Sequence, residues 1–220
     1  GITKIEKIDD FNNAFKYALI FSRNKRIIVE EFIESKGSQL HGDGFVYNGK
    51  LIFSYLGDHH YNSQINPFVP YSTTWPSKKS EFEIKKVEKE LEKVINLSGF
   101  KNGAINIEAR ISPKGEIYIM EIGPRSGGNF VPQVINYSTG FDMVKATLDV
   151  INGQKINLIH LTQKTAAYYV VHSDKNGVLQ NIEIKNEIKP YIKEFHQYIQ
   201  PGEKVKSFQG ANAAIGILLL

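Results

Sequence analysis

The chain has 220 residues and a formal net charge of +4, with 41% hydrophobic and 23% charged residues, a balance typical of a globular protein with a sizeable core. The absence of cysteine excludes a disulfide framework and thiol chemistry and is consistent with the cytoplasm, where we expect the protein to act. The apolar runs are too short to span a membrane, and lysines alternate with acidic residues instead of forming a basic patch. We therefore expect neither a membrane nor a nucleic acid as partner.

The first part of the chain is predicted to hold a helix followed by a strand. Asp9 or Asp10 precedes a run in which apolar residues recur at helical spacing, which indicates a capped helix that ends near residues 22–25. Residues 27–29, Ile-Ile-Val, predict a buried strand.

A hairpin and an irregular region are predicted next. Asn48-Gly49 favours a tight turn between two strands, on which His41 and Asp43 face either a cleft or solvent. Residues 57–76 are interpreted as the longest irregular region, with tandem histidines His59 and His60 inside it. Adjacent histidines on a strand point to opposite faces and no third ligand follows at zinc spacing, so we do not predict a zinc site.

An amphipathic helix is predicted from Ser80 to Leu97. Ser80 and Glu83 have the spacing of a capping box, and the apolar residues that follow form one buried stripe. We assign this helix a structural role.

Residues 103–129 carry most of the chemical information. Apolar residues alternate with Asn106, Glu108 and Arg110, residues 112–115 favour a turn, and a second alternating strand carries Glu121. A two-residue turn would pair Glu108 with Ile119 and put Glu108 diagonally across from Glu121, and a bulge would shift this register by one residue.

Two carboxylates on one face repel each other, so they need a shared proton or a cation between them. Their hard oxygen atoms favour Mg²⁺ or Mn²⁺, which commonly accompany nucleotide phosphates. The next residues, 123–129, contain Arg125, whose planar fork suits phosphate or carboxylate, and glycines that allow close backbone approach. The alternative is a hairpin whose polar face is merely solvated, but this leaves the arginine and the glycines unexplained.

Residues 130–151 lead into further helix, and Asn152-Gly153 marks a boundary. From Lys164 the pattern changes to short strands, and the apolar end of the chain is expected to complete a paired strand. The fold class predicted is therefore α+β, divided into residues 1–153 and a small β-rich part at residues 160–220.

Residues 107–110 and 120–129 together resemble the metal-binding hairpin of the ATP-grasp superfamily, over roughly residues 1–150. The sequence is most similar to carboxylate–amine ligases related to the L-amino acid (dipeptide) ligases, and less so to biotin carboxylase and carbamoyl phosphate synthase. The resemblance implies the large, C-terminal lobe of the ATP-grasp fold, with an antiparallel sheet and flanking helices, followed by a small β-rich domain that we interpret as a structural cap.

The resemblance also assigns roles to individual residues. It implies that ATP and Mg²⁺ or Mn²⁺ bind here, with Glu108 and Glu121 as metal ligands and Arg125 against the phosphoryl or acyl-phosphate group. Other positions match those that hold adenine (Glu30, Glu31, Phe32, Ile33), ribose (Gln39), the acceptor substrate (His59, His60, Tyr61) and the oxyanion or substrate (Gly127, Gly128, Asn129).

The chain departs from the family pattern at Gly123, where many members carry an Asn that is a further metal ligand. We interpret this change as the mark of a subfamily, and it leaves the metal coordination incompletely assigned. The chain opens on Gly1 without an initiator Met, where the family has a glycine-rich loop after its small lobe, so we expect a C-terminal fragment that alone binds ATP weakly and does not turn it over.

The implied function is an ATP-dependent ligase that forms an amide bond between small-molecule carboxylate and amine substrates through an acyl phosphate, and a homodimer is one assembly that the resemblance allows. The nearest alternative enzyme phosphorylates bicarbonate, as carbamoyl phosphate synthase and biotin carboxylase do, and the residues around Gly123 argue against it. The other alternative is a nucleotide-binding module without turnover, against which Glu108, Glu121 and Arg125 argue.

Overall fold

The computed structural model describes residues 1–156, 158 and 161–220. Its described residues divide into two compact units, Gly1–Glu34 and Ser35–Leu220.

The first unit consists of the 3₁₀ turn η1 (Ile8–Asp10), helix α1 (Phe11–Phe21) and an extended segment. Asp10 occupies the N-cap position of α1, but its side chain makes no capping hydrogen bond. The buried strand predicted at residues 27–29 is wrong: Ile28 and Val29 are 82% and 65% exposed, and none of the described strands pairs with this segment. A strand needs a partner for its backbone groups as well as an apolar sequence.

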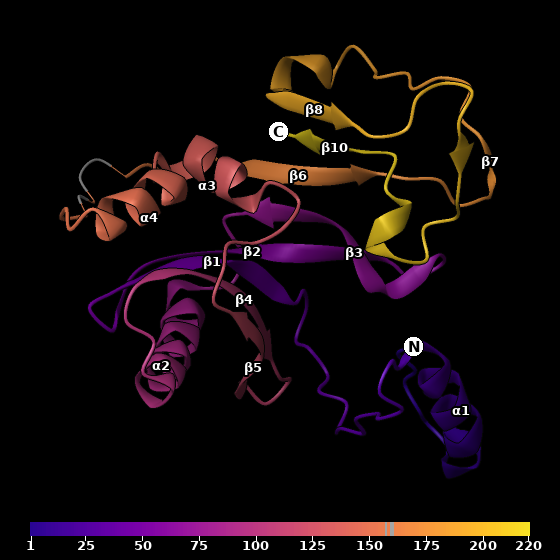
Figure 1. Cartoon of the computed structure of the whole chain (residues 1–220), viewed down its shortest axis with the longest axis horizontal. Helices are drawn as coiled ribbons and strands as arrows, with labels where there is room; N and C mark the ends of the chain where they lie inside the picture. The colour runs from indigo at the N-terminus through magenta and orange to yellow at the C-terminus, as the bar shows by residue number, and fades with distance from the viewer. Residues whose placement is uncertain (157, 159–160) are drawn as a thin grey trace. The chain divides into compact units, whose positions relative to one another are not determined.

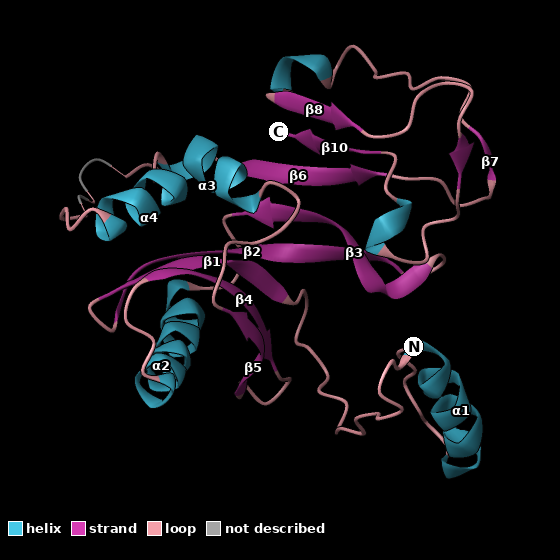
Figure 2. Cartoon of the chain, in the orientation of Figure 1, coloured by secondary structure: helices cyan, strands magenta, loops and turns pink. Residues whose placement is uncertain are grey.

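The second unit is built on a mixed-length antiparallel sheet (Figure 1; Figure 2). Within the described residues the sheet has eight strands in the order β5-β4-β1-β2-β3-β6-β10-β8. The strands are β1 (Leu40–Tyr47), β2 (Lys50–Asn62), β3 (Asn66–Trp75), β4 (Gly103–Ile111), β5 (Ile117–Gly123), β6 (Ala166–Val171), β8 (Glu194–Gln197) and β10 (Gly216–Leu219). A separate short pair joins β7 (Gly177–Val178) to β9 (Lys204–Val205).

Helices flank this sheet, as Figure 2 shows. They are α2 (Glu81–Ser98), α3 (Val131–Thr139) and α4 (Met143–Ile151), with short 3₁₀ turns η2 (Lys189–Tyr191) and η3 (Ala211–Ala213). The α+β class, with an antiparallel sheet and flanking helices, is thereby confirmed. Among the described residues, no helix combines the length and the apolar character needed to cross a membrane.

The predicted irregular region at residues 57–76 is wrong, because its residues form most of β2 and β3. β3 pairs with β2 on one side and with β6 on the other, through partners such as Ser72 and Tyr169. The strand partner β6 lies about a hundred residues further along the chain, so local sequence gave little sign of it. Bulges on either side of Tyr61 accommodate Pro70, which cannot donate a backbone hydrogen bond.

Helix α2 confirms the prediction for Ser80 to Leu97. Ser80 and Glu83 form the capping box, in which each side chain binds the other's backbone N–H, and Gly99 ends the helix at φ 70°. Val87, Leu91 and Ile95 of its apolar stripe are buried.

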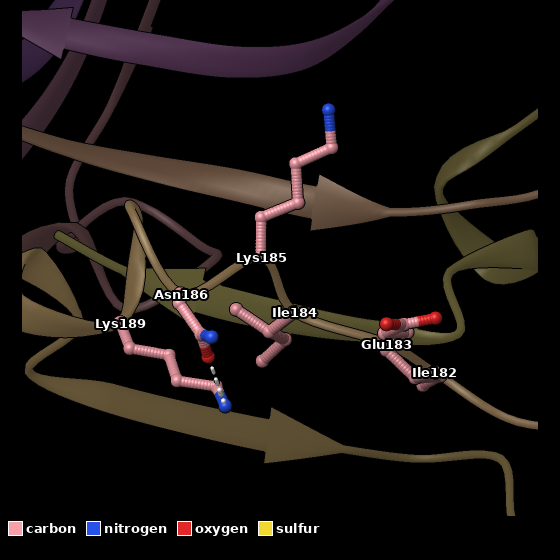
Figure 3. Close-up of a pocket in the computed structure, with 6 residues that line it drawn as sticks. All are labelled: Ile182, Glu183, Ile184, Lys185, Asn186 and Lys189. Atoms are coloured by element: carbon pink, nitrogen blue, oxygen red, sulfur yellow. Dashed lines mark hydrogen bonds between the residues drawn. The ribbon is translucent and has the colours of Figure 1, made fainter.

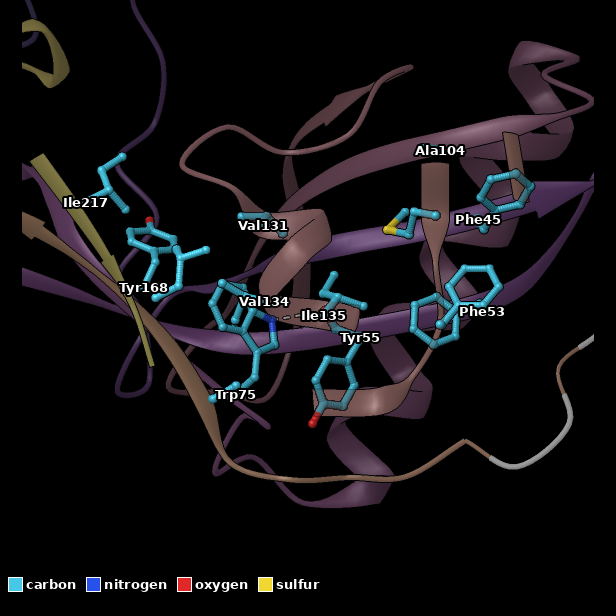
Figure 4. Packing of buried hydrophobic residues seen from close by; sticks show 14 of the residues in the cluster. Phe45, Phe53, Tyr55, Trp75, Ala104, Val131, Val134, Ile135, Tyr168 and Ile217 are labelled. Carbon is cyan, nitrogen blue, oxygen red and sulfur yellow. Dashed lines mark hydrogen bonds between the residues drawn. The ribbon is translucent and has the colours of Figure 1, made fainter. Parts of the chain in front are cut away.

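The two faces of the sheet carry separate apolar cores. On one face, α2 packs against alternate residues of β1 and β4, including Leu40, Ile105 and Ile107. On the other face, α3 and α4 cover a larger core around Trp75 and Tyr168 (Figure 4). Because strand residues alternate between faces, Asn106, Glu108 and Arg110 lie on the second face, beyond the edge of its apolar core.

The C-terminal strands extend the same sheet. β6 pairs with β3, and β10 lies between β6 and β8, so the expectation that the chain ends in a paired strand is confirmed. Strand β8, at Glu194–Gln197, forms the edge of the sheet beyond β10. The division into domains at 1–153 and 160–220 stays a prediction, and residue 160 lies outside the described residues.

Candidate functional site

The β4–β5 hairpin places Glu108 directly opposite Glu121. The turn has three residues, since the Ser112 N–H donates to the Glu116 carbonyl at 2.9 Å and Gly115 adopts φ 81°. A bulge at Met120 then shifts the register between Glu108 and Ala109. The predicted pairing of Glu108 with Ile119 is therefore wrong, because Ile119 pairs with Ala109, but the two carboxylate residues do lie on the same face.

A hydrogen-bonded chain of polar side chains crosses this face of the sheet. The Gln39 amide donates from Nε2 to Glu108 Oε2 at 2.6 Å and accepts at Oε1 from Arg110 Nε at 2.6 Å. Gln39 is only 6% exposed, and both the nitrogen and the oxygen of its buried amide are hydrogen-bonded, one to Glu108 and the other to Arg110. This arrangement fixes the direction in which Glu108 presents its second oxygen.

The charge state of Glu108 reflects its neighbours. Burial is the main cause that raises the pKa of Glu108, and the negative charge of Glu121 raises it further. The Gln39 hydrogen bond and the positive charges of Arg110 and Arg125 act in the opposite direction. A carboxylate pair held in this way is stabilised by a cation between the two groups.

Arg125 brings positive charge to the same face. Its Nη1 donates to the Ser126 carbonyl at 2.8 Å, and its charge acts on Glu108, His41 and Asp43. Together, Arg110 and Arg125 provide cationic groups near the acid pair, a combination suited to anionic ligands that are themselves bound through a metal.

Asp43 anchors the glycine-rich loop from inside the sheet. This fully buried carboxylate accepts from the Gly127 N–H at 2.9 and 2.8 Å on its two oxygens, and from Asn106 Nδ2 at 2.9 Å. Burial raises the pKa of Asp43 to about 6, against the effect of these donors. A side chain at Gly127 would approach the Asp43 and Asn106 side chains to 2.9 Å, so this close contact requires glycine.

Two stacked histidines lie beside this anchor. The rings of His41 and His59 are 4.1 Å apart and nearly parallel, and both face the Thr73 hydroxyl, at 3.3 and 2.7 Å. Burial lowers the pKa of His41 to about 4 and also lowers the pKa of His59. Both rings are therefore neutral near pH 7, and His41 and Asp43 face the protein interior, not solvent.

The other predicted substrate residues are placed as follows. Burial raises the pKa of Tyr61, the nearby charge of Glu108 raises it further, and the charge of Arg110 lowers it. His60 follows His59 on the strand and bonds Thr74 Oγ1 at 2.9 Å, so the structure does not bring it to the face of Glu108. The Asn129 side chain shares a hydrogen bond with Tyr168, and a side chain at Gly128 would meet no atom within 4 Å.

Residues 30–33, the predicted adenine segment, belong to the first unit. There the Lys4 ammonium lies 4.4 Å from the centre of the Phe32 ring. Their place beside the carboxylate pair stays a prediction.

Sequence reasoning missed the structural roles of Asp43, Asn106, Thr73 and Tyr168. Their partners lie far away in the chain, as with Asp43 and Gly127, which are 84 residues apart. The one available signal is an alternation of polar residues on strands whose other face is apolar.

Two features of the described residues limit other sites. No group of three or more His, Cys, Asp or Glu side chains that could hold a metal ion is found among them, so a metal at Glu108 and Glu121 would complete its coordination with ligand oxygens or water. The hollow shown in Figure 3 is lined by residues 182–186 and 189 of one segment, where Lys189 donates to Asn186 at 2.8 Å. It contains none of the residues named above.

The fold of the chain is similar to the folds of several solved structures. L-amino acid ligase from Bacillus licheniformis matches with a TM-score of 0.82 and 19% identity, over 100% of this chain and 55% of that one. Phosphoribosylglycinamide synthetase from Anaerococcus prevotii matches with a TM-score of 0.70 and 23% identity, over 98% and 55%. The biotin carboxylase domain of 2-oxoglutarate carboxylase from Hydrogenobacter thermophilus, solved with MgADP and bicarbonate, matches with a TM-score of 0.71 and 14% identity, over 97% and 47%.

The model of the ATP-grasp domain family matches residues 1–133, and the chain therefore belongs to the ATP-grasp family. An uncharacterized protein of Sinorhizobium fredii, y4rH, is 22% identical over an aligned length of 183 residues, and the match covers 81% of this chain and 36% of that protein. The chain thus spans about a third of this curated relative and about half of the solved structures above.

Proposed function

We propose that the protein is an ATP-dependent ligase that joins a small-molecule carboxylate to an amine through an acyl phosphate. The observation that carries this proposal is the placement of Glu108 directly opposite Glu121 on a face that also receives the charges of Arg110 and Arg125. Membership of the ATP-grasp family supports ATP as the nucleotide.

In the proposed reaction, a carboxylate oxygen attacks the γ-phosphorus of ATP, and ADP leaves. The amine nitrogen then attacks the acyl carbon of the acyl phosphate, a proton is lost, and inorganic phosphate leaves as the amide bond forms. No covalent enzyme intermediate is needed, which fits a chain without cysteine.

Individual residues have distinct tasks in this proposal. Glu108 and Glu121 offer the hard oxygen ligands that Mg²⁺ prefers, and the bound ion would neutralise charge on the phosphate oxygens. Arg125 binds the transferring phosphoryl group through its guanidinium fork. Gln39 was expected to bind ribose, but its amide is engaged at both ends, so we propose that it orients Glu108 and Arg110.

The test is ADP release by the protein with MgATP, screened against pairs of amino acids, small carboxylates with amines, and bicarbonate. We expect release that depends on both a carboxylate and an amine, and we expect Glu121→Ala to abolish it. Glu116→Ala is the matched control, because it removes the same charge from the turn of the same hairpin, where Glu116 bonds Ser112.

Each other outcome has a clear meaning. A fully active Glu121→Ala variant would refute the metal assignment. Release with bicarbonate alone would identify a bicarbonate-phosphorylating enzyme, and no release with any substrate would favour a binding module.

A further inference from the structure

The glycine-rich loop ends in an unusual backbone conformation. Asn129 and Phe130, which are consecutive and not glycine, both adopt left-handed φ angles of 54° and 60°. Such a backbone conformation is strained for a residue other than glycine and persists only where surrounding contacts hold it. Phe130 is also the N-cap residue of α3, so this conformation sets the angle between the loop and the helix.

The contacts that hold these two residues come from the C-terminal strands. The Asn129 side chain shares a hydrogen bond with Tyr168 on β6. The Phe130 ring stacks on the ring of His196 on β8, with centroids 3.9 Å apart and planes 14° from parallel. Both partners lie beyond residue 133, where the match to the family model ends.

Glu194, two residues before His196 on the same strand, connects this stack to the body of α3. One of its carboxylate oxygens lies 2.6 Å from His196 Nε2, and the other accepts from the Tyr137 hydroxyl on α3. Strand β8 therefore contacts α3 at two places: His196 stacks on Phe130 at the N-cap, and Glu194 accepts a hydrogen bond from Tyr137 near the C-terminus. We call these four residues, Phe130, Tyr137, Glu194 and His196, the α3 clasp.

We propose that His196 is a positioning residue: by stacking on Phe130 it holds the left-handed end of the glycine-rich loop and thereby the placement of Arg125 and Gly127. The C-terminal strands then help to form the site instead of serving only as a cap. The part of this inference that concerns Arg125 in catalysis rests on the proposed function, whereas the clasp itself does not.

The experiment measures amide hydrogen exchange of residues 123–133 in the 220-residue protein without nucleotide. An aromatic stack contributes about 0.5–1.5 kcal/mol, so His196→Ala should speed exchange of this segment about twofold to tenfold. His196→Phe keeps a flat ring against Phe130 and should restore most of the protection.

His172→Ala is the matched control. His172 also lies in the C-terminal region and stacks on a phenylalanine, Phe208, at 4.6 Å, but not on the loop. Unchanged exchange in His196→Ala would overturn the proposal, because the stack would then not stabilise the loop. Equal acceleration in His172→Ala would also overturn it, because the effect would then be a general loosening of the C-terminal region.

A second readout connects the clasp to catalysis. His196→Ala should lower kcat for ADP release more than it raises KM for ATP, with recovery in His196→Phe. If wild-type protein releases no ADP, the proposed function fails while the exchange result still decides whether the clasp exists.

Discussion

The two faces of the β1–β4 strand pair differ in what they bury. On the α2 face, Leu40 and Ile107 are completely buried among other aliphatic side chains. On the opposite face the next residues along the same strands, His41 and Asn106, are almost as deeply buried, although they are polar. These side chains are therefore buried to a similar extent on the two faces, but they are apolar on one face and polar on the other.

This difference supports the proposal that the polar part of the second face binds a ligand. Burying an apolar side chain contributes roughly 1.5–3 kcal/mol, whereas burying a polar group is unfavourable unless its hydrogen bonds are satisfied. The polar face satisfies them through contacts such as Asp43 with Gly127 and Gln39 with Glu108. A face that retains charged groups at this cost is expected to bind something, and the following variants test the contrast.

The largest effect is expected on the apolar face. Leu91→Ala removes a completely buried side chain of α2 and should lower the free energy of unfolding by about 2–5 kcal/mol. Leu97→Ala on the same helix is the control, because Leu97 is 88% exposed and its loss should change stability by less than about 0.5 kcal/mol. Urea unfolding followed by fluorescence of Trp75, the single tryptophan, measures both. Equal effects would mean that α2 does not pack as described.

A smaller effect with a pH signature is expected on the polar face. The pKa of Asp43 is raised from 3.8 to about 6, so between these values the folded state keeps a proton that the unfolded state releases. In the wild type, the contribution of Asp43 to the free energy of unfolding is therefore greatest at low pH and is lost as the pH rises through about 6. In Asp43→Asn this loss is absent, so the stability of the variant relative to wild type should rise by about 3 kcal/mol between about pH 4 and pH 7. Parallel urea-unfolding stabilities across that range would contradict a buried, perturbed Asp43.

The smallest effect concerns the contact between the polar face and the loop. Gly127→Ala places a Cβ atom 2.9 Å from the Asp43 and Asn106 side chains and 3.0 Å from Val131 Cβ, and should destabilise by about 1–3 kcal/mol. Gly128→Ala adds the same atom one residue later, where nothing lies within 4 Å, and should be close to neutral. Thermal unfolding of the two variants distinguishes them, and similar melting temperatures would show that the loop does not rest on Asp43.

Local patterns predicted much of the second unit. The alternation in residues 103–123 indicated both strands of the hairpin, and the Ser80–Glu83 capping box indicated where α2 begins. These features depend on periodicity and on residues three positions apart, which the sequence displays directly. The failures, at residues 27–29 and 57–76, involve strands, whose existence depends on partners elsewhere in the chain.

For the candidate site, too, some features were predictable from the sequence and others depended on the tertiary structure. The sequence by itself determined that Glu108 and Glu121 share one face of a hairpin and that an arginine and glycines follow them, because strand alternation and chain order decide both. Only the tertiary structure decided that a bulge at Met120 sets the acids directly opposite each other, and that Gln39, Asp43 and His196 support the acid pair and the loop. Those contacts join residues tens of positions apart, and the physical reason is that a folded sheet, not the local chain, brings their hydrogen-bonding and stacking partners within reach.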